Sequence, residues 1–184
     1  MRIYKRPPKP VSYEPSKYLQ KYADHIIYSD LPIVDVACGY GRNGAYVANL
    51  NHKVIFADID QDCLDFIEEG KGFNELKTIL PENKMVYKAD LLVHWPFLKE
   101  SLGGIICVHF YTHDIISKCL ESIGKGGFFY FETISARSGN IASLPRRNEI
   151  YNLIKDRFEI LFYSEKQTPS PDRNTCIVFA IKKT

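Results

Sequence analysis

The stretch VDVACGYGRNGAYVA, residues 34–48, holds the residues whose spacing is most suggestive of chemistry. Gly39, Gly41 and Gly44 give it the pattern G-x-G-x-x-G. Glycine lacks a Cβ and tolerates positive φ, so a backbone built this way can approach a ligand closely. A helix that begins near Arg42 would also point its free N–H groups at an anionic part of that ligand.

Three acidic residues accompany this segment in or at the end of apolar runs. Asp35 lies inside PIVDVAC, Asp58 comes 19 residues after Gly39 in KVIFADI, and Asp90 ends KMVYKAD. A carboxylate at the position of Asp58 accepts hydrogen bonds from ribose hydroxyls. Asp35 suits an ammonium group better than a pyrophosphate, and Asp90 can accept the exocyclic amine of an adenine. The set favours S-adenosylmethionine (SAM) over a nicotinamide dinucleotide, although both use this glycine spacing.

Each carboxylate also has a plain structural alternative. Asp58 can cap the following helix, a role that Asp60 could equally fill, and Asp90 can start a turn. Cys38 is interpreted as a small core residue rather than a nucleophile. We expect ligand binding at Asp58 and Asp90.

The elements that must hold these residues alternate between apolar runs and helical patterns. Strands are expected at 32–38, 53–59, 84–90, 103–110, 126–134, 158–166 and 175–183. Helices are expected at 16–29, 42–50, 60–70, 112–124 and 145–156, while 71–83 is ambiguous. This alternation predicts a mostly parallel sheet with helices on both faces. The last two strands lack a helix between them and should be antiparallel.

In order and spacing these segments resemble the class I SAM-dependent methyltransferases from about Tyr18 onward. The five segments similar to the family's motifs are VDVACGYGRNG, VIFADID, YKADLLVHWPF, GGIICVHF and LESIGKGGFFYFET. The resemblance implies an α/β, three-layer Rossmann-like fold with a seven-stranded, mostly parallel sheet and an antiparallel last strand. The continuation GRN is similar to the small tellurite-resistance-type enzymes, which act on thiol- or chalcogen-like acceptors.

The resemblance also implies which residues bind the cofactor SAM. These are Asp35, Ala37, Cys38, Gly39, Gly41, Asp58, Ile59, Asp90, Leu91 and His109. In this pattern Asp58 binds the ribose and Ile59 packs against the adenine. Asp90 and the backbone at Leu91 read the adenine edge, and His109 lies near the sulfonium and its methyl group.

The residues after the fourth expected strand are the candidates for catalysis. His109, Tyr111 and His113 lie in VHFYTHD, and a neutral histidine can take a proton from a thiol or hydroxyl near pH 7. His113 can equally be an ordinary residue of the next helix. The segment lacks the N/D-P-P-Y/F run and the Pro-Cys nucleophile of DNA methyltransferases. We therefore expect a small-molecule acceptor, with RNA and protein acceptors left open.

Composition narrows the class of protein. The 184 residues and 45% hydrophobic content suit one domain, residues 18–184, and leave little room for the second domain of a dehydrogenase. A net charge of +2 is too small to predict nucleic-acid binding. Five cysteines without a C-x-x-C pair favour reduced thiols in a cytoplasmic protein with no metal site. The sequence contains no run of 18 apolar residues, so we expect no membrane-spanning helix. A non-catalytic SAM-binding or partner-binding module and a nicotinamide-dependent oxidoreductase domain remain the alternatives.

Residues 1–17 form a basic, proline-rich N-terminal arm in this interpretation. We expect the arm to act as a flexible lid over the ligand site, with a loose tail as the alternative. The oligomeric state is not indicated by any pattern. For Gly41→Val we expect loss of binding with less damage to folding than to affinity.

Overall fold

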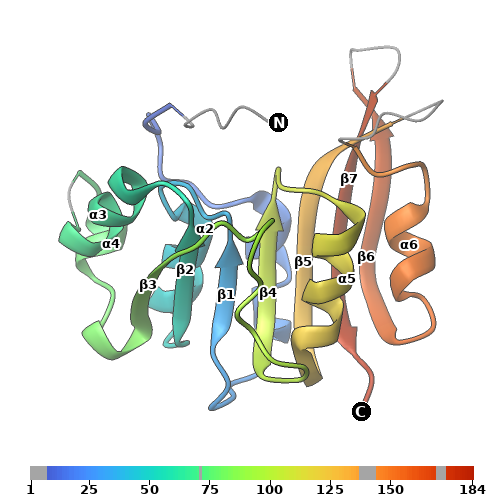
Figure 1. Cartoon of the computed structure of the whole chain (residues 1–184), viewed down its shortest axis with the longest axis horizontal. Helices are drawn as coiled ribbons and strands as arrows, with labels where there is room; N and C mark the ends of the chain where they lie inside the picture. Colours follow the sequence, from blue (N-terminus) through green and yellow to red (C-terminus); the bar gives the residue numbers. More distant parts are fainter. Residues whose placement is uncertain (1–7, 71, 137–143, 169–172) are drawn as a thin grey trace.

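The computed structural model describes residues 8–70, 72–136, 144–168 and 173–184. Its strands are β1 (Ile33–Val36), β2 (Val54–Asp58), β3 (Lys84–Lys88), β4 (Leu102–Val108), β5 (Ile123–Ala136), β6 (Phe158–Gln167) and β7 (Arg173–Lys182). They form one seven-stranded sheet in the order β3-β2-β1-β4-β5-β7-β6 (Figure 1).

The direction of the strands confirms the expected fold class. The pairs β1–β2, β1–β4, β2–β3 and β4–β5 are parallel. β7 is antiparallel to both of its neighbours, β5 and β6. The connection between β6 and β7 is too short for a crossover helix, which forces the antiparallel hairpin. β7 lies inside the sheet, between β5 and β6, and β6 forms the edge.

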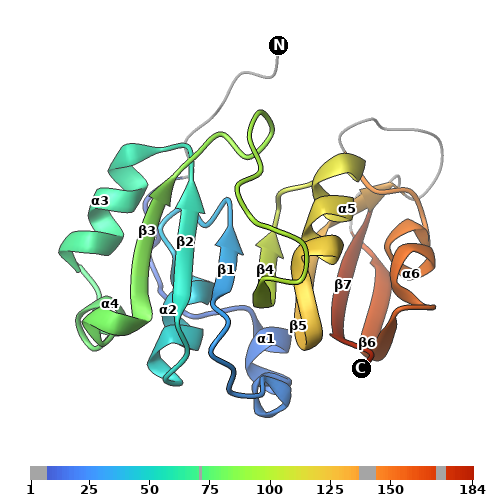
Figure 2. The same ribbon diagram turned by 60° about the horizontal axis from the view of Figure 1, so that its bottom comes forward.

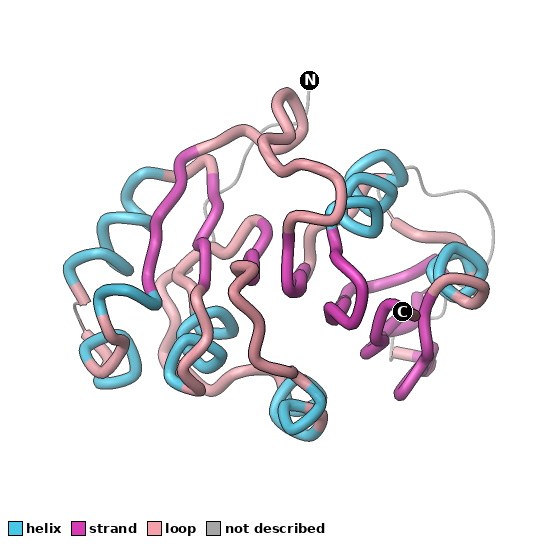
Figure 3. Tube along the Cα trace, turned by 90° about the horizontal axis from the view of Figure 1, so that it is seen from below, coloured by secondary structure: helices cyan, strands magenta, loops and turns pink. Residues whose placement is uncertain are grey.

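Helices cover both faces of this sheet, as Figure 3 shows in a view near the strand direction. They are α1 (Lys17–Lys21), η1 (Ala23–His25), α2 (Arg42–Asn49), α3 (Gln61–Glu69), α4 (Asn74–Lys77), η2 (Pro81–Asn83), α5 (His113–Ser122) and α6 (Glu149–Ile154). Apolar side chains of α1–α4 pack into one core cluster, and those of α5 and α6 pack into the other. Figures 1 and 2 place α2–α4 beside β1–β3 and α5–α6 beside β5–β7.

Two expected helices differ from the structure. The helix expected at 16–29 is only α1 followed by η1, because the backbone leaves the helical region at Tyr22 and is extended at Ile26. Within α1, Tyr18 stacks on Phe162 with ring centroids 4.4 Å apart. The helix expected at 145–156 starts at Glu149, since the Pro145 carbonyl accepts a hydrogen bond from the Ala136 amide. Residues 89–101, described throughout, connect β3 to β4 by turns and extended chain without a helix.

Helix caps follow the predicted chemistry. Asp60 caps α3, accepting hydrogen bonds from the amides of Asp62 at 2.9 Å and Cys63 at 3.4 Å. Gly70 ends that helix in the left-handed conformation, with a φ of 64°. Within the described residues, none of the helices has the length and apolar character needed to cross a membrane.

Candidate functional site

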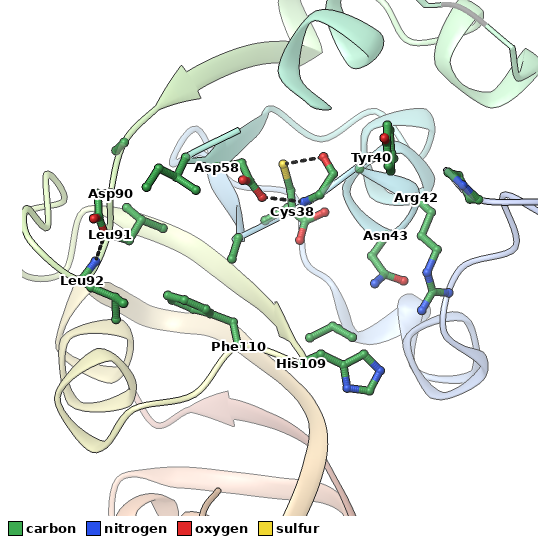
Figure 4. A pocket seen from close by; sticks show the side chains of 18 of the residues that line it. Cys38, Tyr40, Arg42, Asn43, Asp58, Asp90, Leu91, Leu92, His109 and Phe110 are labelled. Atoms are coloured by element: carbon green, nitrogen blue, oxygen red, sulfur yellow. Dashed lines mark hydrogen bonds between the residues drawn. The ribbon is translucent and has the colours of Figure 1, made fainter. Parts of the chain in front are cut away.

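A cavity of about 560 Å³ opens where β1, β2, β3 and β4 end (Figure 4). All ten residues that the family resemblance assigned to the cofactor contribute to its wall. The remaining lining residues are Pro8, Pro10, Tyr40, Arg42, Asn43, Ala89, Leu92, Val108 and Phe110. The sequence interpretation placed the arm that contains Pro8 and Pro10 over the ligand site but named none of the other seven as ligand contacts. In Figure 4, Asp90 and Leu91 lie at one end of the cavity, while Arg42 and His109 lie toward the other.

Asp35 is a buried carboxyl group at the end of β1. Its side chain is 3% exposed, and Oδ2 accepts a hydrogen bond of 2.8 Å from the Gly44 amide. Burial raises the pKa of Asp35 to about 7, while the Gly44 amide and the Arg42 charge oppose that rise and Asp58 adds to it. A cation placed in the cavity would favour the ionised form. Asp35 therefore suits an ammonium group.

The turn after β1 holds three residues in the left-handed region. The φ values are 52° for Ala37, 54° for Gly39 and 79° for Gly41. The turn is closed by a 2.9 Å hydrogen bond from the Gly41 amide to the Cys38 carbonyl. A non-glycine residue with positive φ is strained by about 1–2 kcal/mol, and such strain concentrates at ligand sites. The tight turn brings the start of α2 against the cavity.

Gly41 is also required by the core, which corrects the expectation for Gly41→Val. A Cβ at this position would lie 2.7 Å from Ile67 Cδ1 and 3.0 Å from Phe56 Cδ1. The added side chain would therefore meet buried apolar groups, whereas the expectation had placed it in the space of the ligand. The substitution must damage folding as well as affinity, because the surrounding core is already filled.

Asp58 joins β2 to the glycine turn. Oδ2 accepts a 2.7 Å hydrogen bond from the Gly39 amide, and Oδ1 accepts one of 2.9 Å from the Asp60 amide. The alternative role of capping α3 is performed by Asp60. Each carboxylate oxygen of Asp58 has a second acceptor position. Asp58 can thus hold the turn and accept ligand hydroxyls at the same time.

Asp90 forms a turn and lines the cavity. Its Oδ1 accepts a 3.0 Å hydrogen bond from the Leu92 amide, and its carbonyl accepts bonds from the amides of Val93 and His94. Asp90 therefore does start a turn, which was the structural alternative to ligand binding. Leu91 beside it is 3% exposed, whereas Ile59 from the end of β2 is 40% exposed. These two apolar side chains offer surfaces for a flat ring.

His109 follows β4 in a strained backbone conformation. Its φ is 58°, and its amide donates a 2.8 Å hydrogen bond to the Glu132 carbonyl on β5. The side chain is exposed, and the residue lines the cavity with Val108 and Phe110. The pairing with β5 fixes His109 at the cavity wall despite the strain.

The first turn of α2 binds the N-terminal arm. Arg42 donates from Nη1 to the Glu14 carbonyl at 2.6 Å and from Nη2 to Ser16 Oγ at 3.4 Å. Asn43 Oδ1 accepts a 2.9 Å hydrogen bond from the Ser16 amide. In the sequence, these two residues could have been found from their place directly after Gly41, the second glycine of the motif.

Tyr13 anchors the arm farther along. Its ring is 3% exposed and stacks on Phe73 with centroids 4.6 Å apart, and its hydroxyl donates to the Tyr40 carbonyl. Pro8 and Pro10, which precede this anchor, line the cavity. From Tyr13 onward the arm is therefore built into the domain.

Tyr111 and His113, expected beside the reacting methyl group, are not among the residues lining the cavity. Both contact Glu149 at the start of α6, which no sequence pattern had singled out. The Tyr111 hydroxyl lies 2.6 Å and His113 Nδ1 lies 2.9 Å from Glu149 Oε1. The sequence also offers the arginines that follow β5 as contacts for a carboxylate or phosphate of the acceptor, with solvated surface charge as the alternative. Of these, Arg146 is exposed and Arg137 falls outside the described residues.

Comparison with known proteins places this geometry in a fold family. No family model matches the chain. It is 25% identical over 156 residues to ribosomal protein L11 methyltransferase of Thermoanaerobacter pseudethanolicus, which covers 84% of this chain and 46% of that protein. The chain thus spans about half the length of the curated relative that it matches.

Solved structures extend the comparison. A SAM-dependent methyltransferase from Methanosarcina mazei aligns with a TM-score of 0.67 at 15% identity, over 92% of this chain and 99% of that one. TehB from Haemophilus influenzae aligns with a TM-score of 0.64 at 22% identity, over 90% and 66%. Geranyl diphosphate C-methyltransferase from Streptomyces coelicolor aligns with a TM-score of 0.68 at 14% identity, over 90% and 77%. The chain has the class I methyltransferase fold. Within that fold, the cavity lies where parallel strands end, the usual ligand position in open α/β sheets.

Proposed function

We propose that this class I fold binds SAM and transfers its methyl group to a small-molecule acceptor. The observation that carries the proposal is the cavity whose wall contains Asp35, Asp58 and Asp90 at the ends of three adjacent strands. Structures of geranyl diphosphate methyltransferase in this fold hold SAM or S-adenosylhomocysteine. That likeness supports the same cofactor here.

The proposed orientation follows from the charges along the cavity. Asp58 accepts the ribose hydroxyls, and Asp90 with the Leu91 backbone binds the adenine edge. Ile59 packs on the adenine ring. The methionine end lies toward Asp35, whose carboxylate faces the ammonium group.

The site for the methionine end is completed by Arg42 and by the turn that contains Ala37, Cys38, Gly39 and Gly41. The free amides at the start of α2 and the Arg42 guanidinium suit the methionine carboxylate. The same arrangement disfavours a nicotinamide dinucleotide, because its pyrophosphate would meet the carboxyl group of Asp35.

Methyl transfer from a sulfonium is an in-line displacement on an already activated donor. The protein must mainly align the acceptor and exclude water. His109, at the end of β4, is placed near the sulfonium in this orientation. Pro8 and Pro10 cover part of the cavity, which supports a covering role for the arm held by Tyr13.

A small acceptor is supported by fold neighbours such as geranyl diphosphate C-methyltransferase, whose complex holds a small prenyl diphosphate. The relative found by sequence bears the name of a ribosomal protein methyltransferase, so protein and RNA acceptors belong in the test.

The test combines binding with turnover. Isothermal titration of the full chain should give saturable binding of SAM and S-adenosylhomocysteine and much weaker binding of NAD. A screen for S-adenosylhomocysteine release should then find turnover with a small thiol, phenol or carboxylic acid. Preferential binding of NAD would overturn the cofactor, and SAM binding without turnover on any acceptor would favour a non-catalytic module.

A further inference from the structure

Glu149, the first residue of α6, contacts two side chains of the segment that follows β4. Its Oε1 lies 2.6 Å from the Tyr111 hydroxyl and 2.9 Å from His113 Nδ1, and its Oε2 accepts a 2.8 Å hydrogen bond from the Arg146 amide. Tyr111 and His113 come from the connection after β4, whereas Glu149 is the first residue of α6. The contacts span 36–38 positions in the chain. Nothing in the proposed cofactor site uses them.

The protons in this cluster can be assigned from chemistry. The hydrogen bonds from Tyr111, His113 and the Arg146 amide outweigh burial and lower the pKa of Glu149, so it is a carboxylate at neutral pH. Burial, followed by the bond to Glu149, raises the pKa of Tyr111, which therefore keeps its proton. A carboxylate only accepts hydrogen bonds. His113 must consequently donate from Nδ1, which leaves the lone pair of the neutral ring on Nε2.

The exposure of Glu149, Tyr111 and His113 differs, and the difference suits a buried carboxylate that holds an accessible imidazole. The side chain of Glu149 is 18% exposed and Tyr111 is 7% exposed, whereas the His113 side chain is 66% exposed. The carboxylate is thus shielded while the imidazole reaches solvent. A carboxylate that holds one ring nitrogen sets the tautomer, so that the other nitrogen presents its lone pair.

The position along the chain relates the cluster to the cavity. His109 and Phe110 line the cavity, and His113 begins α5 after the same short turn. α5 follows β4, so α5, whose first residue is His113, begins at the edge of the sheet where the parallel strands end (Figure 1). The charged neighbours of the cluster are Arg146 before α6 and Asp114, which pairs with Lys118 at 2.7 Å.

We propose that Glu149 is a positioning residue that presents Nε2 of His113 as the proton acceptor for a methyl acceptor that carries an ionisable S–H or O–H group. The inference rests on the proposed function and specifies its substrate class. As the acceptor sulfur or oxygen forms its bond to the methyl carbon, the S–CH₃ bond of SAM breaks and its electron pair stays on sulfur. His113 takes the acceptor proton and later releases it to water. The products are the methylated acceptor, S-adenosylhomocysteine and one proton.

The first experiment reads the tautomer without any substrate. In ¹⁵N-labelled protein above the pH of histidine titration, two-bond ¹H–¹⁵N spectra should show His113 protonated on Nδ1. Glu149→Gln supplies an amide that can donate to Nδ1, so the Nε2–H tautomer should become populated. A wild-type His113 that is protonated on Nε2 would overturn the proposal.

The second experiment measures turnover with 2-mercaptoethanol and catechol as probes. His113→Asn should lower kcat/KM by about 100-fold or more, the usual contribution of a general base, and remove the acid limb of its pH profile. Glu149→Gln should lower kcat by at least about tenfold with little change in KM. SAM affinity should stay within about twofold of wild type in both variants.

Glu165 provides the matched control for Glu149. Its two carboxylate oxygens accept hydrogen bonds from the Asn148 amide at 3.1 and 3.2 Å, so it holds the same turn without touching His113. Glu165→Gln should retain turnover within about twofold. If it loses as much as Glu149→Gln, Glu149 acts only by holding the turn and the proposal is wrong. Wild-type protein that binds SAM but methylates neither probe would also overturn it, whereas wild-type protein that fails to bind SAM would instead overturn the proposed function.

Discussion

The two halves of the edge where the strands end are built by different kinds of contact. On the β1–β2–β3 side, carboxylates accept hydrogen bonds from backbone amides, as in Asp35 with Gly44 and Asp58 with Gly39. On the β4–β5 side, carboxylates that accept from backbone amides, such as Glu149, also bind other side chains, as in Tyr111 with Glu149 and Tyr130 with Glu132 at 2.6 Å.

This difference separates a fixed site from an adaptable one. Backbone amides in a turn between a strand and a helix are held by the elements on both sides, so their positions change little. Contacts between side chains can be replaced or rearranged by rotamer changes without altering the sheet. Carboxylates held by backbone amides suit a cofactor that stays the same among proteins of one fold. Contacts between side chains suit an acceptor that differs among them.

The largest effect should come from crowding the fixed half. Gly41→Val adds a side chain against Ile67 and Phe56 at a φ of 79°. Left-handed strain and overpacking together should lower the free energy of unfolding by about 2–5 kcal/mol. Urea denaturation measures this loss. Gly126→Ala is the control, because its φ is 76° but an added Cβ meets nothing within 4 Å. Equal losses in the two variants would show that Gly41 is not crowded.

Removing the carboxylate of Asp58 should produce the next largest effect. Asp58→Ala deletes the acceptor of the Gly39 amide hydrogen bond, which is also the group proposed to accept the ribose hydroxyls. We expect the Kd of S-adenosylhomocysteine to rise about 10- to 150-fold, equivalent to 1.5–3 kcal/mol. Titration calorimetry checks this. Asp60→Ala, which removes only the cap of α3, should cost about 1 kcal/mol of stability and leave the Kd unchanged.

If Asp35 faces the ammonium group as proposed, its buried carboxyl should make SAM affinity depend on pH. Its pKa in the folded protein is about 7, so at pH 5 the group is almost wholly protonated. Binding of an ammonium group then requires loss of a proton, and affinity should increase at least about tenfold from pH 5 to pH 7. Calorimetry of Asp35→Asn should show weak affinity that does not follow this rise. A parallel rise in both proteins would assign the pH dependence to another group.

The stability of the protein without ligand should change with pH in the opposite direction to its affinity for SAM. Because folding raises the pKa of Asp35 above its unfolded value near 3.9, its contribution is fully present below about pH 4. The contribution is lost as the pH rises through about 7. Urea midpoints of the wild type should therefore fall relative to those of Asp35→Asn between pH 4 and pH 8. A constant difference would contradict the burial of this carboxyl.

The smallest effect concerns the anchor of the arm. Tyr13→Phe removes the hydroxyl that donates to the Tyr40 carbonyl but retains the ring that stacks on Phe73. We expect a loss of about 1 kcal/mol in unfolding free energy. Affinity for S-adenosylhomocysteine should weaken by only a few-fold, since Pro8 and Pro10 are then less firmly held. Full affinity in this variant and in a deletion of residues 2–10 would contradict the covering role of the arm.

The fixed half was predictable because its contacts follow from local patterns. Asp58 and Gly39 stand at the ends of adjacent parallel strands, so the strand–glycine–helix pattern alone brings them together. Asp60 and Gly70 likewise obey the rules for helix ends. In these cases the backbone geometry that a short segment adopts determines the contact.

The adaptable half could not be predicted in the same way. Glu149 meets His113 only after β5 and a long connection have returned the chain to the same edge, and no spacing encodes that return. The buried contacts of Tyr13 could not be predicted for a similar reason. Its partners Tyr40 and Phe73 are far apart in sequence, and its proline-rich surroundings favoured an extended, loose arm.

The place of β7 in the sheet has a consequence for the order of synthesis. β7 is translated after β6 yet lies between β5 and β6, and its ladder is the one that joins β6 to the described sheet. While the ribosome is still making β7, β5 has an open edge and the apolar segment FEILFYSEK has no strand beside it. An open edge of this kind invites pairing with other chains. A nascent chain halted after residue 167 should therefore be captured by chaperones or aggregate, whereas a chain that also contains the ten residues of β7, Arg173–Lys182, closes both edges at once.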